Sequence, residues 1–189
     1  MSEARGITVL GICGSLRAAS YNRAILRIAI ELKPPGMTIE TAEIGDIPLY
    51  NEDVRAQGFP PSVEKLRRQI AAADALLFVT PEYNYSMSGV LKNAIDWASR
   101  PPDQPFAGKP VGIMGAGAGL AGTARAQYDL RRSCIYLDMH PLNKPEVLIG
   151  QAHTKFDASG RFTDEAGLGF IRDLLVALEQ WTRLIGGNA

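Results

Sequence analysis

Short apolar runs alternate along this sequence with segments in which apolar residues recur every three or four positions. Ile7–Ile12, Ala75–Thr80 and Pro110–Gly115 are almost wholly apolar, as expected for strands covered on both faces. Met37–Ile44 alternates apolar and polar residues and predicts a further strand. Strands that alternate with helical patterns are typical of βαβ units, so the sequence predicts an α/β fold with a parallel sheet.

Helical spacing fills the gaps between the strands and completes a predicted order of βαβαβαβαβα. Ser88 is a candidate N-cap for the helix after the third strand, and Asp164 for the last helix. Tyr136–Met139 and Val147–Ile149 are interpreted as a split fifth strand, whereas Pro48–Pro60 is interpreted as an irregular connection. The remaining helices are predicted over Tyr21–Lys33, Pro61–Ala72, Ser88–Ser99 and Thr123–Ser133.

The composition is that of an ordinary globular chain. Its 189 residues are 46% hydrophobic and 21% charged, which suffices for one domain over residues 1–189 with its own core. The 20 basic residues offset the 20 acidic ones, so neither a nucleic acid nor a membrane surface is expected as a partner. Cys13 and Cys134 form no CxxC pair, which favours a reduced, cytoplasmic protein. The N-terminal apolar run is too short for a signal peptide or a membrane span.

The loops after the strands are the places to look for a site. In an open parallel sheet, ligands bind beyond the carboxyl ends of the strands, where the strand order reverses. That point is expected between the first and third strands, so three loops matter: Cys13–Ser20, Pro81–Ser86 and Gly115–Gly122. These loops are also the richest in small, hydroxyl-bearing and turn-forming residues.

The first loop joins a strand to a helix N-terminus, which offers unpaired N–H groups and a partial positive charge to a phosphate. Ser15, Ser20 and Asn22 can donate hydrogen bonds, and Arg17 can add a charge-assisted one. Gly14 lets the backbone approach a ligand closely. The alternative interpretation is a capped βα turn without a ligand, because serine and asparagine are common caps.

The second loop places Tyr83, Asn84 and Tyr85 at the end of a buried strand. A planar heteroaromatic ring needs a flat wall and a few backbone or amide partners, and this loop has both. Alternatively, the loop is a rigid turn whose tyrosines pack at a subunit contact. The two interpretations are compatible, because Tyr85 can face a neighbouring subunit while the loop also faces a ring.

The third loop contains Gly117–Gly122, formally a GxGxxG motif with Asp138 as a distant acid. We do not interpret it as a dinucleotide fingerprint, because it follows the fourth strand and leaves too little chain for a two-half Rossmann sheet. A glycine turn that passes close to a cofactor edge explains it equally well. The chain has neither a P-loop nor a GxSxG elbow, and His140 and His153 lack the spacing of metal ligands.

Two motifs carry a family likeness when they are taken together. They are GSLRxxSxNR at residues 14–23 and PEYNYSxxGxLKNAIDW at residues 81–97. The pair resembles the NADPH-dependent FMN reductase family, and most closely its quinone, ferric and chromate reductase branch, over nearly the whole chain. The resemblance implies a flavodoxin-like three-layer sandwich with a five-stranded parallel sheet, bound FMN, NADPH or NADH as donor, and a homodimer or homotetramer.

The resemblance also implies roles for individual residues by position. It implies no metal site and no fixed acid–base pair, because the flavin performs the hydride transfer. The turn that contains Gly115 and Gly117 is expected to approach the flavin ring from the far side. The implied subunit-contact residues are Tyr85, Arg125 and Glu146. The implied FMN phosphate ligands are Ser15, Arg17, Ser20 and Asn22. The residues implied to line the isoalloxazine are Pro81, Glu82, Tyr83, Asn84 and Ser86.

The activity implied is a ping-pong cycle. NAD(P)H gives a hydride to the flavin and leaves, and a quinone, ferric chelate, chromate or similar small acceptor then takes the electrons at the same face. The alternatives are a non-enzymatic electron carrier of the flavodoxin type and an FMN-binding regulatory module. Electron carriers of the flavodoxin type tend to be acidic, whereas this chain is formally neutral. The physiological acceptor and the choice between NADH and NADPH stay open.

Overall fold

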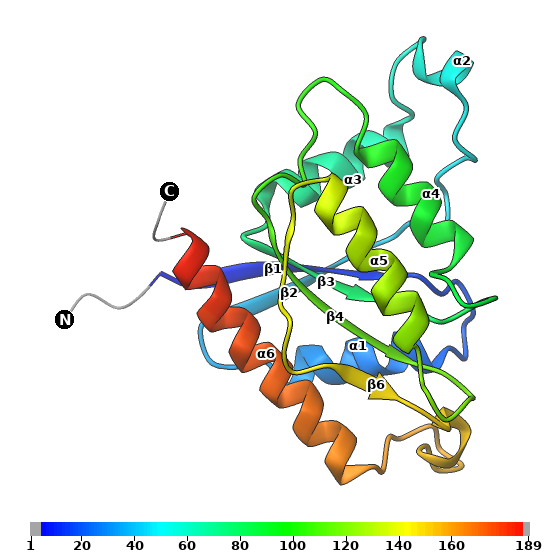
Figure 1. The fold of residues 1–189 in the computed structure, drawn as a ribbon, viewed down its shortest axis with the longest axis vertical. Coiled ribbons are helices and arrows are strands. Elements are labelled where there is room, and N and C mark those ends of the chain that lie inside the picture. Colours follow the sequence, from blue (N-terminus) through cyan, green and yellow to red (C-terminus); the bar gives the residue numbers. More distant parts are fainter. Residues whose placement is uncertain (1–4, 187–189) are drawn as a thin grey trace.

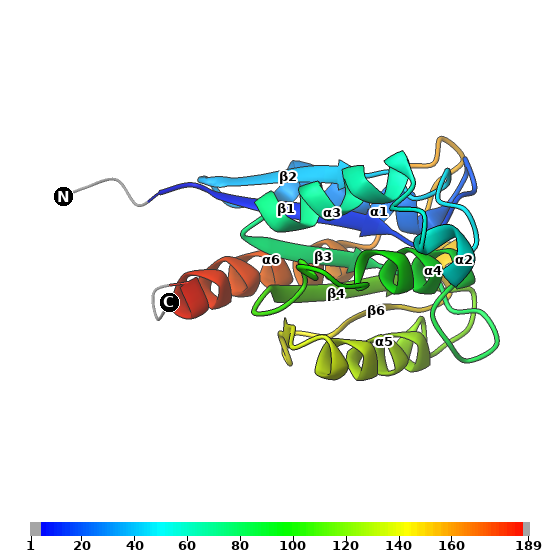
Figure 2. The same ribbon diagram turned by 90° about the horizontal axis from the view of Figure 1, so that it is seen from above.

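A computed structural model describes residues 5–186 and shows a parallel sheet between two layers of helices (Figures 1 and 2). The strand order is β2-β1-β3-β4, and its direction reverses between β1 and β3. Both β5 and β6 pair with β4, at different places along it, on the side away from β3. The predicted α/β fold with a parallel sheet is confirmed. The strands are β1 (Ile7–Cys13), β2 (Met37–Ala42), β3 (Ala75–Val79), β4 (Pro110–Ala116), β5 (His140–Pro141) and β6 (Val147–Ile149).

Helices cover both faces of this sheet. One face carries α1 (Tyr21–Leu32) and α6 (Glu165–Gly186). The other carries α3 (Pro61–Ala72), α4 (Gly89–Ala98) and α5 (Ala124–Tyr136). Two short elements, α2 (Glu52–Arg55) and the 3₁₀ helix η1 (Ala152–Thr154), lie in connections. No helix within residues 5–186 is both long and apolar enough to cross a membrane.

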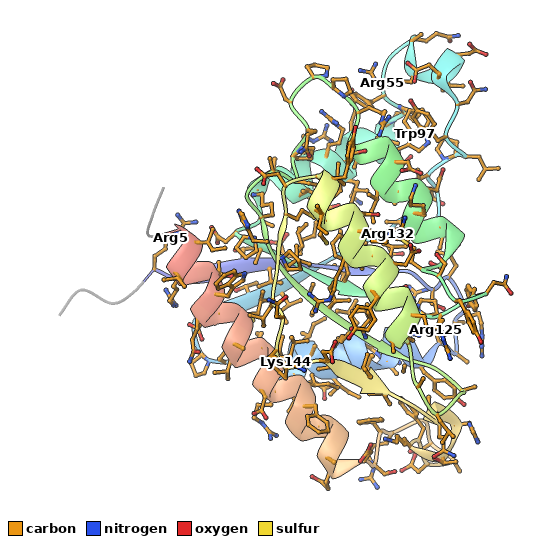
Figure 3. All side chains as sticks on the ribbon, in the orientation of Figure 1. Arg5, Arg55, Trp97, Arg125, Arg132 and Lys144 are labelled. Carbon is orange, nitrogen blue, oxygen red and sulfur yellow. The ribbon has the colours of Figure 1, made fainter. Side chains whose placement is uncertain are left out.

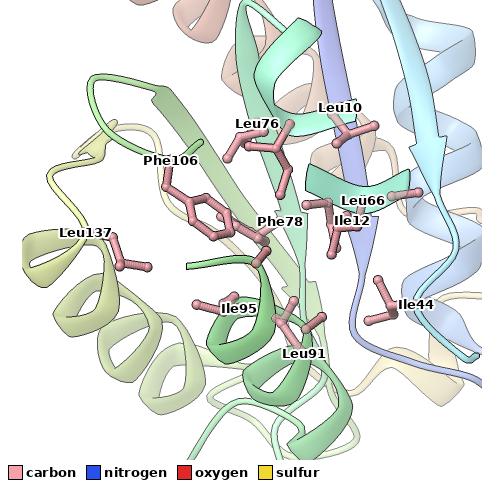
Figure 4. Packing of buried hydrophobic residues seen from close by; sticks show 14 of the residues in the cluster. Leu10, Ile12, Ile44, Leu66, Leu76, Phe78, Leu91, Ile95, Phe106 and Leu137 are labelled. Atoms are coloured by element: carbon pink, nitrogen blue, oxygen red, sulfur yellow. The ribbon is translucent and has the colours of Figure 1, made fainter. Parts of the chain in front are cut away.

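The core has two halves because alternate residues of each strand point to opposite faces. On β1, Leu10 and Ile12 join the half under α3, α4 and α5, whereas Val9 joins the half under α1 and α6. On β3, Phe78 lies in the first half together with Leu91 of α4 (Figure 4). Burial on both faces explains why these strands are continuous apolar runs.

Both predicted helix caps are confirmed. The Ser88 hydroxyl accepts the Leu91 N–H at 3.4 Å, at the start of α4. The Asp164 carboxylate pairs with the Lys155 ammonium and also accepts N–H groups in the first turn of α6. Together these donors, the lysine foremost, hold the pKa of Asp164 below its ordinary value.

The strand predicted over Tyr136–Met139 is wrong. Tyr136 is the last residue of α5, and the sheet position belongs to His140–Pro141 instead. The helix ends in a Schellman motif: Asp138 has φ +54°, and the Met139 N–H donates to the Cys134 carbonyl at 2.9 Å. The short, mostly apolar segment here therefore belongs to a helix end.

The connection at Pro48–Pro60 is less irregular than predicted. It contains the one-turn helix α2, which begins at an Asn51 cap. Two side chains of α4 hold its start, since Asn93 Nδ2 and Trp97 Nε1 each donate to the Pro48 carbonyl at 2.8 Å. Asn93 Oδ1 also accepts the Tyr50 N–H at 2.8 Å. The connection is therefore fixed against α4, where Figure 3 labels Trp97.

Candidate functional site

The three loops singled out in the sequence meet at the carboxyl ends of β1, β3 and β4, at the right-hand edge of the sheet in Figure 1. The Gly14 N–H donates to the Val79 carbonyl at 2.8 Å, and the Thr80 N–H to the Met114 carbonyl at 3.1 Å. These bonds extend the pairing of the strands into the loops. The sheet therefore holds the loops in a fixed order.

The first loop provides a cradle of N–H donors. The backbone N–H groups of Ser15–Ala19 make no hydrogen bond within residues 5–186, and they lie directly before the N-terminus of α1. Ser20 is the N-cap, since its hydroxyl accepts the Arg23 N–H at 3.3 Å. Arg17 is exposed and makes one long bond, to the Ala19 carbonyl at 3.3 Å. Free N–H groups, a helix N-terminus and a guanidinium fit a phosphate group.

The side chain of Asn22, which the resemblance implies as a phosphate ligand, is hydrogen-bonded to the backbone of Ala116. Its Nδ2 donates to the Ala116 carbonyl and its Oδ1 accepts the Ala116 N–H, both at 2.9 Å. All four atoms are buried, and the two residues are 94 positions apart. The amide thus ties the start of α1 to the end of β4, where the glycine turn begins.

Ser88 ties the first loop to the second. Its hydroxyl donates to the Gly14 carbonyl at 2.6 Å, in addition to capping α4. A Cβ on Gly14 would lie only 2.7 Å from the same hydroxyl oxygen. Glycine is needed at this position for close packing between the two loops, besides any approach to a ligand.

The second loop is a tight hairpin. Tyr83 and Ser86 exchange two backbone hydrogen bonds of 3.0 Å. The two residues between them, Asn84 and Tyr85, have φ of +51° and +67°, the signature of a type I′ turn. Asparagine tolerates this conformation, whereas tyrosine rarely adopts it, so the contacts around the hairpin must hold Tyr85 in place. Tyr83 and Tyr85 are 51% and 70% exposed and form an aromatic rim.

Residues of α5 make the contacts that hold the hairpin in place. The Glu82 carboxylate accepts the N–H groups of Arg125 and Ala126 at 2.9 and 3.1 Å, and pairs with the Arg125 guanidinium at 3.1 Å. That guanidinium stacks on the Tyr85 ring, 4.0 Å from its centre. Ser86 donates its hydroxyl proton to Asp129. Figure 3 shows Arg125 at the start of α5, beside these loops.

The glycine turn forms the third wall. A cavity of about 400 Å³ lies between the turn at Gly117–Gly122 and the pair formed by Glu82 and Arg125. A Cβ on Gly117 would collide with the Gly122 carbonyl, so the turn can close only with glycine at this position. The cavity volume falls in the range of small-molecule sites, about 300–1,000 Å³. The wall at the turn contains three glycines, so part of it is backbone that a flat ring can approach closely.

The dinucleotide interpretation of the glycine motif finds no support. The anion position at the N-terminus of α5 is filled by the Glu82 carboxylate, which would repel a pyrophosphate. Asp138 lies at the other end of α5, where it forms the helix terminus. The motif is therefore a close-packed turn, as the sequence interpretation favours.

The thiol nearest the site has a raised pKa. Cys13 ends β1 and is partly buried, and burial raises the pKa of its thiol. The sulfur lies 3.9 Å from the Ser15 carbonyl oxygen. A partly buried thiol with a raised pKa is suited to packing as a small apolar residue.

Several residues that build the site were missed in the sequence. Asp129 and Asn93 act through contacts with residues far away along the chain, whereas Thr123 packs against Gly115 of the third loop. Asn93 belongs to the second motif, which was the one signal available. Nothing in the sequence marked Asp129 as the partner of Ser86.

Comparisons with known proteins agree with this geometry. Residues 7–154 match the family model described as NADPH-dependent FMN reductase. A Pseudomonas aeruginosa protein named NAD(P)H-dependent FMN reductase is 65% identical over 181 residues, which cover 96% of this chain and 98% of that protein. An Escherichia coli protein named quinone reductase is 43% identical over 182 residues, which cover 95% of this chain and 97% of that protein.

A solved structure is similar over the same extent. FerB, a flavoenzyme NAD(P)H:(acceptor) oxidoreductase from Paracoccus denitrificans, matches with a TM-score of 0.85 and 36% identity, covering 94% of this chain and 98% of that chain. The family match spans more than half of the sequence, and the relatives span nearly all of it. The resemblance seen in the two motifs is therefore confirmed, and the chain belongs to the NADPH-dependent FMN reductase family.

Proposed function

We propose that this protein is an FMN-containing oxidoreductase that takes electrons from NADPH or NADH and passes them to quinones, ferric chelates, chromate or similar small acceptors. The observation that carries the proposal is an N–H cradle at residues 15–19 together with a cavity at the glycine-rich turn Gly117–Gly122, both at the carboxyl ends of the strands. The first suits the phosphate of FMN and the second its ring. The names of the Pseudomonas, Escherichia and Paracoccus proteins support the same activity.

The residues present fit FMN. Ser15, Arg17 and Ser20 are assigned to the phosphate, and Asn22 is assigned to the same end of the site through its bond to Ala116. The side chains of Glu82 and Ser86 are engaged with α5, so these residues are assigned to the ring through their backbone. The other residues assigned to the ring are Pro81, Tyr83, Asn84, Gly115 and Gly117.

Bound FMN supplies the redox chemistry, accepting a hydride from the nicotinamide and returning electrons to the acceptor. The protein holds the donor or acceptor in a fixed orientation relative to the flavin ring. The hairpin at Tyr83–Ser86 is rigid because α5 holds it, so it can present a fixed wall to the ring. The exposed tyrosines leave the rim open, which suits acceptors of different shapes.

Visible absorbance of the purified protein tests the proposed function. Flavin bands that bleach on anaerobic addition of NADPH or NADH, and return with a quinone, are the expected result. Absence of flavin bands, before and after incubation with FMN, would overturn the cofactor assignment. Flavin bands that neither donor bleaches would instead favour an electron carrier or a regulatory module.

Replacing Arg17 with alanine is expected to weaken FMN binding by roughly 10- to 150-fold. The guanidinium is exposed and nearly free, so its loss removes a charge-assisted bond, worth about 1.5–3 kcal/mol, without disturbing the fold. Titration of the apoprotein with FMN, followed by quenching of flavin fluorescence, measures the change. Arg68→Ala on α3 is the matched control, and equal affinities for the two variants would contradict the phosphate assignment.

We also propose a single domain that assembles as a homodimer or homotetramer in a reducing, cytoplasmic compartment. The one sheet shared by the described residues and the two free cysteines support these assignments. Tyr85 and Arg125 are both exposed. Tyr128, also on α5, donates its hydroxyl proton to Glu146 at 3.0 Å. Sedimentation of the native protein is expected to show a dimer or tetramer, and a monomer at micromolar concentration would contradict the assembly.

A further inference from the structure

A second cavity lies beside the phosphate cradle, between α1 and the end of β2. Its volume is about 260 Å³. Figure 2 shows α1 and β2 next to each other at this edge of the sheet. The cavity touches the first loop through Ser15 and Leu16. It is therefore a neighbour of the FMN phosphate position and lies apart from the ring cavity at the glycine turn.

The cavity carries a net positive charge. Arg23 and Arg27, one turn apart on α1, line it together with a single acidic residue, Glu43. Glu43 makes a loose ion pair with Arg23 at 3.6 Å. Arg27 is exposed and has no ion-pair or hydrogen-bond partner within residues 5–186. Both guanidinium groups lie near enough to oppose the rise in the pKa of Cys13 that burial causes.

Most of the remaining lining is apolar, with Thr41 and Ser15 as the other polar residues. The apolar residues include Leu16, Leu26, Ile30, Ala42 and Ile44. Two arginines beside apolar side chains suit an anion carried on a flat organic body, since one guanidinium can donate two hydrogen bonds to a phosphate group. The volume lies somewhat below the range of about 300–1,000 Å³ typical of sites for whole ligands, so it fits one end of a larger molecule.

We propose that this cavity binds the 2′-phosphate and adjoining adenosine of NADPH, with Arg27 as the residue that distinguishes NADPH from NADH. The inference rests on the proposed function, which requires a nicotinamide dinucleotide at the neighbouring flavin site. The 2′-phosphate is the one group that NADPH has and NADH lacks. A free, exposed guanidinium near the phosphate cradle is suited to recognise it.

Steady-state kinetics of Arg27→Gln test the assignment. The KM for NADPH is expected to rise about tenfold while the KM for NADH stays unchanged. Arg27→Lys keeps the charge but loses the planar fork, so its KM for NADPH should fall between those of the parent and Arg27→Gln. Arg68→Gln, a similarly exposed arginine on α3, should behave as the parent does. A KM for NADPH that does not change, or a change of the same factor for both donors, would overturn the proposal.

Calorimetry separates this proposal from the proposed function. The FMN-loaded protein is titrated with adenosine 2′-monophosphate and with adenosine 5′-monophosphate. The 2′ isomer is expected to bind more tightly, to lose that advantage in Arg27→Gln, and to be displaced by NADP⁺. If it binds but NADP⁺ does not displace it, the cavity is a separate phosphomonoester site and the proposal is wrong. If the enzyme oxidises neither donor, the proposed function fails, whereas NADP⁺ binding that depends on Arg27 would still uphold the cavity assignment.

Discussion

Gly115→Ala is expected to destabilise the protein by about 3 kcal/mol and to abolish tight FMN binding. An added Cβ would collide with the Thr80 carbonyl oxygen and the Thr123 hydroxyl. The first of these belongs to the backbone at the end of β3, so it cannot move aside as a flexible side chain can. Overpacking a rigid interior costs about 1–3 kcal/mol and occasionally more. The strain would separate the ends of β3 and β4, which carry the two loops that we propose to face the ring.

Chemical denaturation of the apoprotein and FMN titration measure the two effects separately. Gly119→Ala is a matched control in the same turn, because no atom lies within 4 Å of the Cβ it would add and its φ is not positive. Its free energy of unfolding should stay within about 0.5 kcal/mol of the parent. If Gly115→Ala proved as stable as Gly119→Ala, the close packing at this glycine would have no energetic role.

The fold could be predicted because its strands are buried on both faces. Continuous apolar runs such as Ala75–Val79 have no alternation to misread, and the proline at the start of α3 and the Ser88 cap mark helix starts locally. The prediction failed at Tyr136–Met139, where a short, mostly apolar segment at a helix end is interpreted as a strand. What decides the structure there is the αL residue Asp138 and the buried face of α5, and neither shows in so short a window.

The site was predictable in its place but not in its contacts. The motifs put Glu82 and Ser86 near a ring, and their loop is at the predicted edge of the sheet. Their side chains, however, bind α5, more than 40 residues further along the chain. The same holds for Trp97 and Pro48, which are 49 positions apart. A sequence motif indicates which residues belong together, whereas only the folded chain shows which of them face the ligand and which hold the loops.

Asn22→Leu tests the difference between a residue that holds the loops and one that binds the ligand. The substitution is expected to cost about 2–6 kcal/mol of stability. Leucine has nearly the size of asparagine but cannot bond to Ala116, whose N–H and carbonyl would both lose their partner in a buried place. Each unsatisfied buried group costs about 1–3 kcal/mol. FMN affinity should fall as well, because α1 and the glycine turn would no longer be held in register. The loss would occur although Ser15 and Arg17, the proposed phosphate ligands, are intact.

Two further variants separate a positioning role from direct phosphate binding. Asn22→Asp can still accept the Ala116 N–H, but it places a carboxylate oxygen against the Ala116 carbonyl, so we expect a loss of stability in the apoprotein as well. Asn143→Leu, on an exposed loop, controls for the substitution itself and should change stability by no more than about 0.5 kcal/mol. A direct phosphate ligand would behave differently: its loss would weaken FMN binding and leave the unfolding of the apoprotein unchanged. Denaturation of the apoprotein therefore decides between the two roles, because only the bridge to Ala116 exists without the cofactor.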